Sequence, residues 1–502
     1  MLEKRWKLKE TMNVLLLNMP VIFNKAENLE PPLGVAYIAS VLKENAHNVR
    51  IVDFEVERFS EEILINVMNG FSPGVIGISC RTASYNSANK ITGMIKRIRP
   101  NIYVVIGGHH VTAFPEESIK DTGCDAAIRG EGEYAMQELV SSLSSKKSLC
   151  DIKGLSYRDG AEIKHNNRRQ LVKDLNKLPF PARELLPNDK YVVNSVITSR
   201  GCPFSCIYCD KSISTQDVRY RTSDNVYDEV KFLNKKYKNK LIYFVDDFFF
   251  LDRSRVSNLF DLLKNNNHKI TWRCQSRVSP LDLSLLPKAK ECGCELIIFG
   301  IETGDAGELD FINKKSTLEE VEKTVKATKD AGISVRANFM LGFPVSTHDS
   351  IRNTIKFAAK LPIDICRFFL VAPFPNTRLW DYVVKHDLIK AKDIDWTGFD
   401  LYSTSYKVPG LTHYELCCYA GAAYIHTLKR HIFREIFSQG FKNISKLFKL
   451  IIDTKRIRGN LSKSFPSVVN LFVELYFLTK KTSFLYKAKY LLNIVRIERS
   501  LS

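Results

Sequence analysis

Short apolar runs that alternate with stretches of helical periodicity constrain the fold of this chain more than any other feature. In the first third of the sequence, the apolar runs occupy 13–19, 50–54, 75–80 and 103–108, and a fifth segment, 126–133, begins with AAI and opens a last helix. Continuous apolar strands with helices between them are typical of a parallel sheet that is covered on both faces. We therefore predict a doubly wound α/β domain here, whose ligands bind beyond the carboxyl ends of the strands.

A second block repeats the alternation with a longer period. Its apolar runs occupy 192–198, 241–245, 270–275, 295–300, 335–341 and 365–371. Thr317 and Glu320 form a capping box at the start of one of the intervening helices. Six β/α units predict a full or partial (β/α)6 barrel, whose functional face is the carboxyl end of its strands.

The predicted domains follow from these blocks. Residues 1–145 form the N-terminal doubly wound (flavodoxin-like) parallel sheet, and residues 146–190 form a linker in which Pro179, Pro181 and Pro187 interrupt regular structure. Residues 191–400 form the central barrel. The strand pattern stops after the barrel, and residues 401–502 are predicted to form a small, basic α-helical region.

Composition supports a globular protein. Of the 502 residues, 45% are hydrophobic and 26% are charged, which excludes wholesale disorder, a collagen-like repeat and a small disulfide scaffold. No run reaches the ~18 uninterrupted apolar residues of a membrane-spanning helix. Asn18 and Pro20 interrupt the apolar run that follows the basic first residues, so we expect no signal peptide and a cytoplasmic protein.

The positive charge is concentrated at the C-terminal end. Residues 428–502 contain 16 basic and 4 acidic side chains among Phe, Leu, Ile and Tyr residues, a pattern that favours peripheral attachment to an anionic membrane. It also suggests a hydrophobic substrate such as a lipid, an isoprenoid or a porphyrin. The alternative is a helical cap that closes the barrel. No nucleic-acid partner is expected, because Phe433, Phe437, Phe441 and Phe448 recur at about the spacing of a helix packing face.

Three of the twelve cysteines lie on one short segment. Cys202, Cys206 and Cys209 have CxxxCxxC spacing in TSRGCPFSCIYCD, directly after the first strand of the barrel. Soft thiolates on a tight loop suit an iron–sulfur cluster, and three of them leave one iron of a [4Fe–4S] cluster open. A structural zinc site is the alternative, but zinc requires a closed shell of four ligands.

Glycine-rich and polar residues follow the strands of the first domain, where a bulky ligand can approach the backbone closely. The candidate ligand-binding residues are Ser79, Thr82, Gly107, Gly108, His109, Gly130 and Glu131.

The cysteine motif, with Tyr208 before its last cysteine, resembles the signature of the radical S-adenosyl-L-methionine (SAM) superfamily. The segments YFVDDFFF, FGIETG and NFMLGFP resemble its barrel, while 104–117 and 126–139 resemble the N-terminal domain of its cobalamin-binding branch. This resemblance extends over 13–400. It implies three cofactors, which are a [4Fe–4S] cluster, SAM and cobalamin.

The resemblance also implies roles for individual residues. Cys202, Cys206 and Cys209 would bind the cluster, and the glycine-rich candidates of the first domain would bind cobalamin. The sequence contains no DxHxxG segment, so it offers no histidine at the usual position of the lower axial ligand to cobalt. The residues implied for SAM are Asp246, Asp247, Arg273, Gln275, Glu302 and Gly342. Arg273 could alternatively face the outer helices. For Asp246 and Asp247, the alternative is a solvated strand end without a ligand.

The activity implied by the resemblance is methyl transfer to an unactivated carbon of a small molecule, initiated by a 5′-deoxyadenosyl radical, with flavodoxin or ferredoxin as the electron donor. A first alternative resembles the anaerobic magnesium-protoporphyrin IX monomethyl ester cyclases, which transfer no methyl group. A second is a non-catalytic cobalamin sensor, which the SAM-type segments disfavour. No residue is assigned a catalytic role from the sequence.

Overall fold

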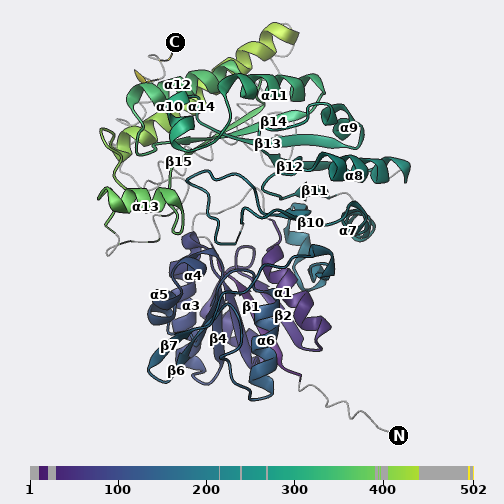
Figure 1. Ribbon diagram of the computed structural model, residues 1–502, viewed down its shortest axis with the longest axis vertical. Helices are drawn as coiled ribbons and strands as arrows, with labels where there is room; N and C mark the ends of the chain where they lie inside the picture. Colours follow the sequence, from purple (N-terminus) through teal and green to yellow (C-terminus); the bar gives the residue numbers. More distant parts are fainter. Residues whose placement is uncertain are drawn as a thin grey trace.

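The computed structural model describes two α/β units that face each other (Figure 1). A cavity lies between them. The described residues are 11–20, 30–213, 215–237, 240–266, 269–390, 394, 396, 399, 405–439, 496–497 and 501.

The first unit is built on a seven-stranded sheet in the order β2-β1-β3-β4-β5-β6-β7. Its first five strands are parallel, and their 2-1-3-4-5 order confirms the predicted flavodoxin-like fold. Its strands are β1 (Asn13–Asn18), β2 (Asn48–Asp53), β3 (Val75–Ser79), β4 (Tyr103–Gly107), β5 (Ala126–Ile128), β6 (Leu155–Asp159) and β7 (Glu162–His165). Its helices are α1 (Leu33–Glu44), α2 (Glu61–Phe71), α3 (Tyr85–Ile98), α4 (His109–Ala113), α5 (Pro115–Thr122) and α6 (Glu133–Ser144).

Helices cover both faces of this sheet, because its central strands are apolar on both sides. Four consecutive residues of β1, Val14 to Leu17, are almost completely buried. Helices α1 and α6 pack together on one face, and α2, α3 and α5 cover the other. The topology reverses between β1 and β3, which opens a crevice at the carboxyl ends of these strands.

The predicted linker contributes to the first sheet. Strands β6 and β7 form an antiparallel hairpin that pairs with β5. Leu155 and Tyr157 of β6 are buried in the core, whereas Glu162 and Lys164 of β7 are exposed. The hairpin is mostly polar because it lies at the edge of the sheet, and its composition therefore resembles that of a linker.

The second unit is a six-stranded parallel sheet in the order β15-β14-β13-β12-β11-β8, which confirms a partial barrel. Its strands are β8 (Val193–Val196), β11 (Leu241–Phe244), β12 (Trp272–Ser276), β13 (Cys294–Glu302), β14 (Ser334–Leu341) and β15 (Ile365–Leu370), with the small pair β9 (Ser199–Arg200) and β10 (Arg219–Tyr220). Its helices are α7 (Ser223–Lys236), α8 (Arg253–Asn265), α9 (Leu285–Glu291), α10 (Ala306–Phe311), α11 (Leu318–Asp330), α12 (His348–Lys360), α13 (Arg378–Lys385) and α14 (His413–Gln439).

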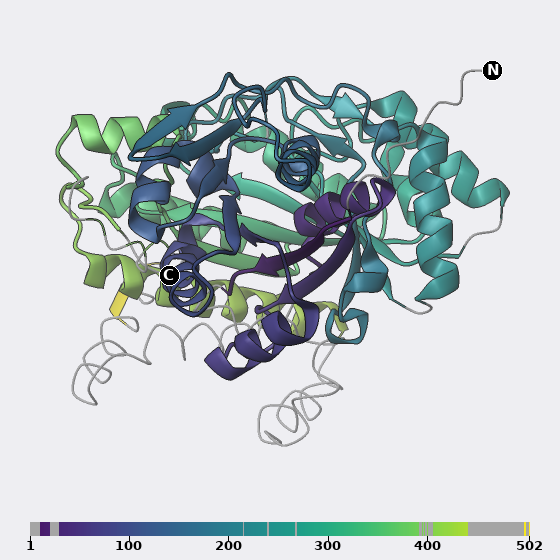
Figure 2. The same ribbon diagram turned by 90° about the horizontal axis from the view of Figure 1, so that it is seen from below.

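The core of the barrel lies between its strands and the outer helices. Phe244, Trp272 and Phe299 are fully buried there, together with residues of the helices. Figure 1 shows α9, α11 and α12 on the side of the sheet that faces away from the first unit. Seen from below, the first unit lies in front of the barrel sheet (Figure 2). The inner face of the barrel is therefore turned toward the N-terminal domain.

Helix α14 confirms helical structure at the start of the C-terminal region, where it packs on α12 and β15. Near the end of the chain, Leu501 is buried against the barrel core. Most of the basic segment 428–502, including the side chains of Phe433, Phe437, Phe441 and Phe448, lies outside the described residues. Among the helices that the structure describes, none has the length and apolarity required to cross a membrane.

Candidate active site

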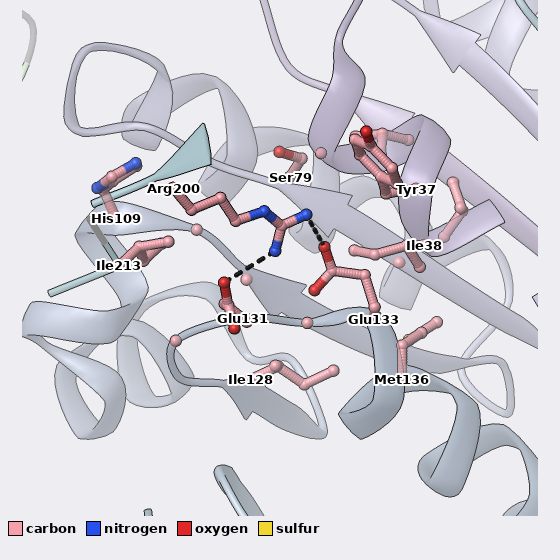
Figure 3. Close-up of a pocket in the computed structure, with 18 of the residues that line it drawn as sticks. Tyr37, Ile38, Ser79, His109, Ile128, Glu131, Glu133, Met136, Arg200 and Ile213 are labelled. Atoms are coloured by element: carbon pink, nitrogen blue, oxygen red, sulfur yellow. Dashed lines mark hydrogen bonds and ion pairs between the residues drawn. The ribbon is translucent and has the colours of Figure 1, made fainter. Parts of the chain in front are cut away.

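A cavity of about 430 Å³ lies between the two units at the β1–β3 crevice. The first unit supplies an apolar floor that includes Leu16, Val105, Ile128 and Met136. The barrel supplies the opposite wall through β9, the start of the cysteine loop and the end of β11 (Figure 3). An apolar cavity with a few polar groups at its rim is typical of a cofactor site.

Arg200 joins the two walls of this cavity. Its Nη1 atom lies 2.8 Å from Glu131 Oε1 and its Nη2 atom 2.7 Å from Glu133 Oε1 (Figure 3). Arg219 Nη1 donates to the same Glu131 carboxylate at 2.9 Å. Burial opposes the charged form of Glu131, but the two arginines outweigh burial and lower its pKa. Glu131 therefore connects the barrel to the first unit through ion pairs. Sequence reasoning did not predict the other members of this network, which are Arg200, Arg219 and Glu133.

The structure places all but one of the predicted ligand-binding residues of the first unit at the cavity. Ser79, Gly107, Gly108, His109, Gly130 and Glu131 all line the cavity. Thr82 does not line it, because it begins the short 3-10 helix Thr82–Ser84 and its hydroxyl lies 3.4 Å from His110 Nδ1. His109 Nδ1 lies 2.9 Å from Oδ2 of Asp210, which directly follows Cys209. One side chain therefore connects the cavity with the cysteine loop.

Gly108 is required by packing within the first unit. Its φ is +119°, and a Cβ atom added there would lie 2.2 Å from the carbonyl oxygen of Cys80. A bulky residue at this position would therefore disrupt the β3–β4 region and could not report on ligand binding.

Gly34 offers a cleaner test of the cavity. It lines the cavity in the first turn of α1, and an added Cβ would meet no atom within 4 Å. We expect Gly34→Leu to fill the cavity and weaken cobalamin binding by about tenfold or more, since overpacking costs about 1–3 kcal/mol. Equilibrium titration with cobalamin measures this change. Gly70→Leu in α2, where an added Cβ is also uncontacted, is the control, and unchanged affinity in Gly34→Leu would place cobalamin elsewhere.

The cysteine loop lies between β9 and β10. Cys202 and Cys206 are buried, and Cys209 is partly exposed. Gly201 begins the loop with a φ of +98°, where an added Cβ would lie 2.6 Å from the Asp217 carbonyl oxygen. The second arm of the loop thus packs tightly on the first, and the Cys202 N–H donates to the Thr215 carbonyl oxygen at 2.9 Å.

The surroundings of the loop suit an anionic thiolate cluster. Arg277 Nη1 donates to Cys206 Sγ at 3.3 Å, and Lys211 Nζ donates to the Cys202 carbonyl oxygen at 3.2 Å. Burial raises the pKa of the Cys209 thiol to about 11, so iron binding must displace the proton that this thiol holds at neutral pH. In the part of the chain that the structure describes, no three His, Cys, Asp or Glu side chains are grouped as ligands of one metal ion. In a [4Fe–4S] cluster each cysteine binds a different iron.

The two aspartates after β11 differ in their surroundings. Asp246 is buried, and its carboxylate accepts hydrogen bonds from the backbone N–H groups of Thr198 at 2.6 Å and Ser199 at 3.1 Å. It does not line the cavity, and its hydrogen bonds fix the segment between β8 and β9. Asp247 does line the cavity, beside the loop that bears the cysteines.

Arg273 and Gln275 lie on the inner face of the barrel sheet, because Trp272 and Cys274 between them face the outer core. The alternative that Arg273 faces the outer helices is therefore wrong. Arg273 Nη2 lies 3.6 Å from Glu30 Oε1, and its guanidinium lies 4.2 Å from the centre of the Tyr243 ring. Gln275 Nε2 donates to the Tyr243 hydroxyl at 2.6 Å.

Glu302 contacts the cysteine loop directly. Its Oε1 atom accepts hydrogen bonds from the Tyr208 hydroxyl at 3.0 Å and from Lys314 Nζ at 2.8 Å. Burial raises the pKa of Tyr208 well above its ordinary value, and the Glu302 charge raises it further. Sequence reasoning missed Lys314, which follows no strand end. Gly342 has a φ of +90°, and its nearest neighbour is Leu416 of α14, 3.0 Å from an added Cβ.

Comparisons with known proteins identify both units. A sequence profile of the B12 binding domain matches residues 19–140, and one of the Radical SAM superfamily matches residues 196–358. An uncharacterized methyltransferase of Pyrococcus horikoshii is 34% identical over 402 residues, which cover 79% of this chain and 87% of that protein. The chain belongs to the cobalamin-dependent radical SAM enzymes.

More distant relatives agree with this membership. The anaerobic magnesium-protoporphyrin IX monomethyl ester cyclase of Rubrivivax gelatinosus is 26% identical over 366 residues, which cover 70% of this chain and 66% of the cyclase. The structure of the cobalamin-dependent SAM radical enzyme OxsB, with aqua-cobalamin and SAM bound, aligns with a TM-score of 0.73 at 18% identity. That alignment covers 98% of this chain and 80% of OxsB, and it supports the fold. The predicted family, its enzymatic nature and its three cofactors are confirmed.

Proposed function

We propose that this enzyme transfers a methyl group from SAM to a carbon atom of a small-molecule substrate. The observation that carries the proposal is the continuity of the two sites. The segment Ser199–Gly201 forms a wall of the cavity, and Cys202 follows it directly. A cobalamin in the cavity and a cluster on the loop would therefore lie next to each other, as a methyl transfer that depends on both requires.

When bound, the cluster and SAM supply radical chemistry, and cobalamin supplies methyl-transfer chemistry. The chain's own residues place these groups and exclude water. We assign the cluster to Cys202, Cys206 and Cys209, and SAM to Asp247, Gln275, Glu302 and Gly342 at the inner strand ends. We assign cobalamin to Ser79, Gly107, Gly108, His109, Gly130 and Glu131. Arg200 holds the two halves of the site together.

The products formed from SAM test this proposal. We expect the reconstituted enzyme, given a strong reductant and SAM, to form both 5′-deoxyadenosine and S-adenosylhomocysteine, because only loss of a methyl group yields the latter. Chromatography with mass spectrometry measures both products, and enzyme reconstituted without cobalamin is the control. Formation of 5′-deoxyadenosine alone would overturn methyl transfer and favour the cyclase-like reaction, a second candidate that the cyclase relatives support.

We further propose that the substrate is hydrophobic and that a flavodoxin or ferredoxin delivers the electrons.

We also propose that the basic segment 428–502 makes reversible contact with a membrane. Each Lys or Arg near an anionic membrane surface contributes about 1 kcal/mol to the free energy of binding. We expect the full chain to float with anionic liposomes but not with neutral ones. Neutralising Lys480, Lys481, Lys487 and Lys489 with glutamine should weaken flotation. If the chain binds neither kind of liposome, the remaining role for this segment is a helical cap that closes the barrel. The packing of α14 on β15 favours that role.

A further inference from the structure

A buried arginine lies against the cysteine loop. Arg277 directly follows β12, the third strand of the barrel sheet along the chain, and it is only 5% exposed. Its Nη1 atom lies 3.3 Å from Cys206 Sγ, which is within the distance of an N–H···S hydrogen bond. Its guanidinium also lies over the ring of Phe204, 3.8 Å from the ring centre. Arg277 therefore contacts the loop at a sulfur and at an aromatic side chain that precedes this sulfur by two residues.

Backbone carbonyl groups hold the guanidinium in this position. Arg277 Nε donates to the Ser279 carbonyl oxygen at 3.2 Å, and Nη2 donates to the carbonyl oxygen of Lys314. The preceding residue, Asn313, donates through Nδ2 to the Ser205 carbonyl oxygen at 3.0 Å, so the segment that carries Lys314 is itself attached to the cysteine loop. Each nitrogen of the guanidinium thus has a directed partner, and its orientation toward the sulfur is fixed.

The charge of Arg277 is not matched by a carboxylate among the described residues. Its partners there are two carbonyl oxygens, a thiol and an aromatic ring, none of which carries a negative charge while the thiol keeps its proton. Burying a cation without a counter-charge is costly. An anionic centre at the Cys206 sulfur would supply that counter-charge, and a thiolate that binds an iron–sulfur cluster is such a centre.

We propose that Arg277 raises the reduction potential of the iron–sulfur cluster by donating a charged N–H···S hydrogen bond to its Cys206 ligand. This inference rests on the assignment of the cluster to Cys202, Cys206 and Cys209. One electron from the electron donor increases the negative charge on the cluster and its sulfurs. A cation whose N–H group is directed at one of these sulfurs stabilises the reduced state more than the oxidised state. Arg277 is thus a positioning residue that acts through a ligand of the cluster.

Redox titration of the full, reconstituted enzyme in the absence of SAM tests this inference. Electron paramagnetic resonance and absorption at defined potentials measure the ratio of reduced to oxidised cluster. Arg277→Met removes the charge and the hydrogen-bond donor but keeps an unbranched side chain. We expect it to shift the one-electron equilibrium about tenfold toward the oxidised cluster, which lowers the midpoint potential by about 59 mV. Arg277→Lys keeps the charge and should lower the potential less.

Arg378→Met is the matched control. Arg378 also donates to the cysteine loop, but its Nη2 atom contacts the Ser205 carbonyl oxygen instead of a sulfur, and its side chain is exposed. This variant should leave the midpoint potential unchanged. An unchanged potential in both Arg277 variants, or an equal fall in Arg378→Met, would overturn the inference.

Iron content and SAM affinity distinguish the remaining outcomes. If Arg277→Met assembles no cluster, the potential of Arg277→Lys decides. Weaker SAM binding in the Arg277 variants with an unchanged potential would assign this arginine to SAM and overturn the inference. An unmodified enzyme that assembles no cluster would overturn the ligand assignment and this inference with it. The potentials do not depend on turnover, so a failure of methyl transfer leaves the test intact.

Discussion

Cys202→Ala, Cys206→Ala and Cys209→Ala should each abolish the iron–sulfur absorbance and all formation of 5′-deoxyadenosine. In the proposed assignment each thiolate would bind a different iron, so the loss of one would leave the cluster with only two protein ligands. In the same assignment SAM would bind the iron that carries no cysteine, so the radical chemistry should disappear with the cluster. Iron and sulfide content, the absorption spectrum and product analysis after anaerobic reconstitution measure these changes.

Cysteines elsewhere in the barrel provide the control. Cys292 and Cys294 are also buried, but they lie at the end of α9 and the start of β13, in the core behind the sheet. Cys292→Ala and Cys294→Ala should retain the cluster and turnover. Loss of the cluster in either variant would show that the ligand assignment is wrong.

Glu229→Ala should destabilise the enzyme by about 3–5 kcal/mol, since removing one partner leaves buried charge uncompensated. Glu229 on α7 is completely buried, and it accepts hydrogen bonds from Arg183 Nη2 at 2.6 Å and from Arg221. These arginines also donate to the carbonyl oxygens of Ser195 and Ile197, at 2.6 and 2.8 Å. The network thus supports the end of β8, which leads through β9 into the cysteine loop.

Denaturant unfolding measures this effect, and Glu291→Ala is the matched control. Glu291 also forms an ion pair, 3.0 Å from Lys264, but both side chains are more than half exposed. Such surface pairs contribute about 0–1 kcal/mol. A loss in Glu229→Ala no larger than that in Glu291→Ala would contradict the proposed role of the network.

Titration of the Glu229 carboxylate should make the free energy of unfolding depend on pH. Burial alone would raise the pKa of Glu229, but the charges of Arg183 and Arg221 outweigh burial and hold the pKa below its usual value of 4.5. The stabilisation is therefore complete above about pH 4.5 and is lost as the pH falls through the folded-state pKa. Glu229→Gln, which cannot titrate here, should lose less stability on acidification than the unmodified enzyme.

The pattern of apolar runs along the chain was sufficient to predict the parallel strands of both sheets. The apolar runs predicted the five parallel strands of the first unit and the six of the barrel, because a strand buried on both faces must be continuously apolar. The hairpin β6–β7 was missed, because an edge hairpin exposes one face and therefore resembles a linker. The cysteine loop was evident for a different reason, since all its ligands lie within eight residues of sequence.

The sequence by itself determined the fold class and the family, because strand patterns and motifs depend on residues that are close together in the chain. The three cofactors followed from the family resemblance. Only the tertiary structure decided that Asp246 supports the backbone while Asp247 faces the cavity, since adjacent residues can point in opposite directions. It alone joined Arg200 to Glu131 and Glu133, and Glu302 to Tyr208. These groups come from distant segments, and no spacing in the sequence records a proximity that strand order and register create.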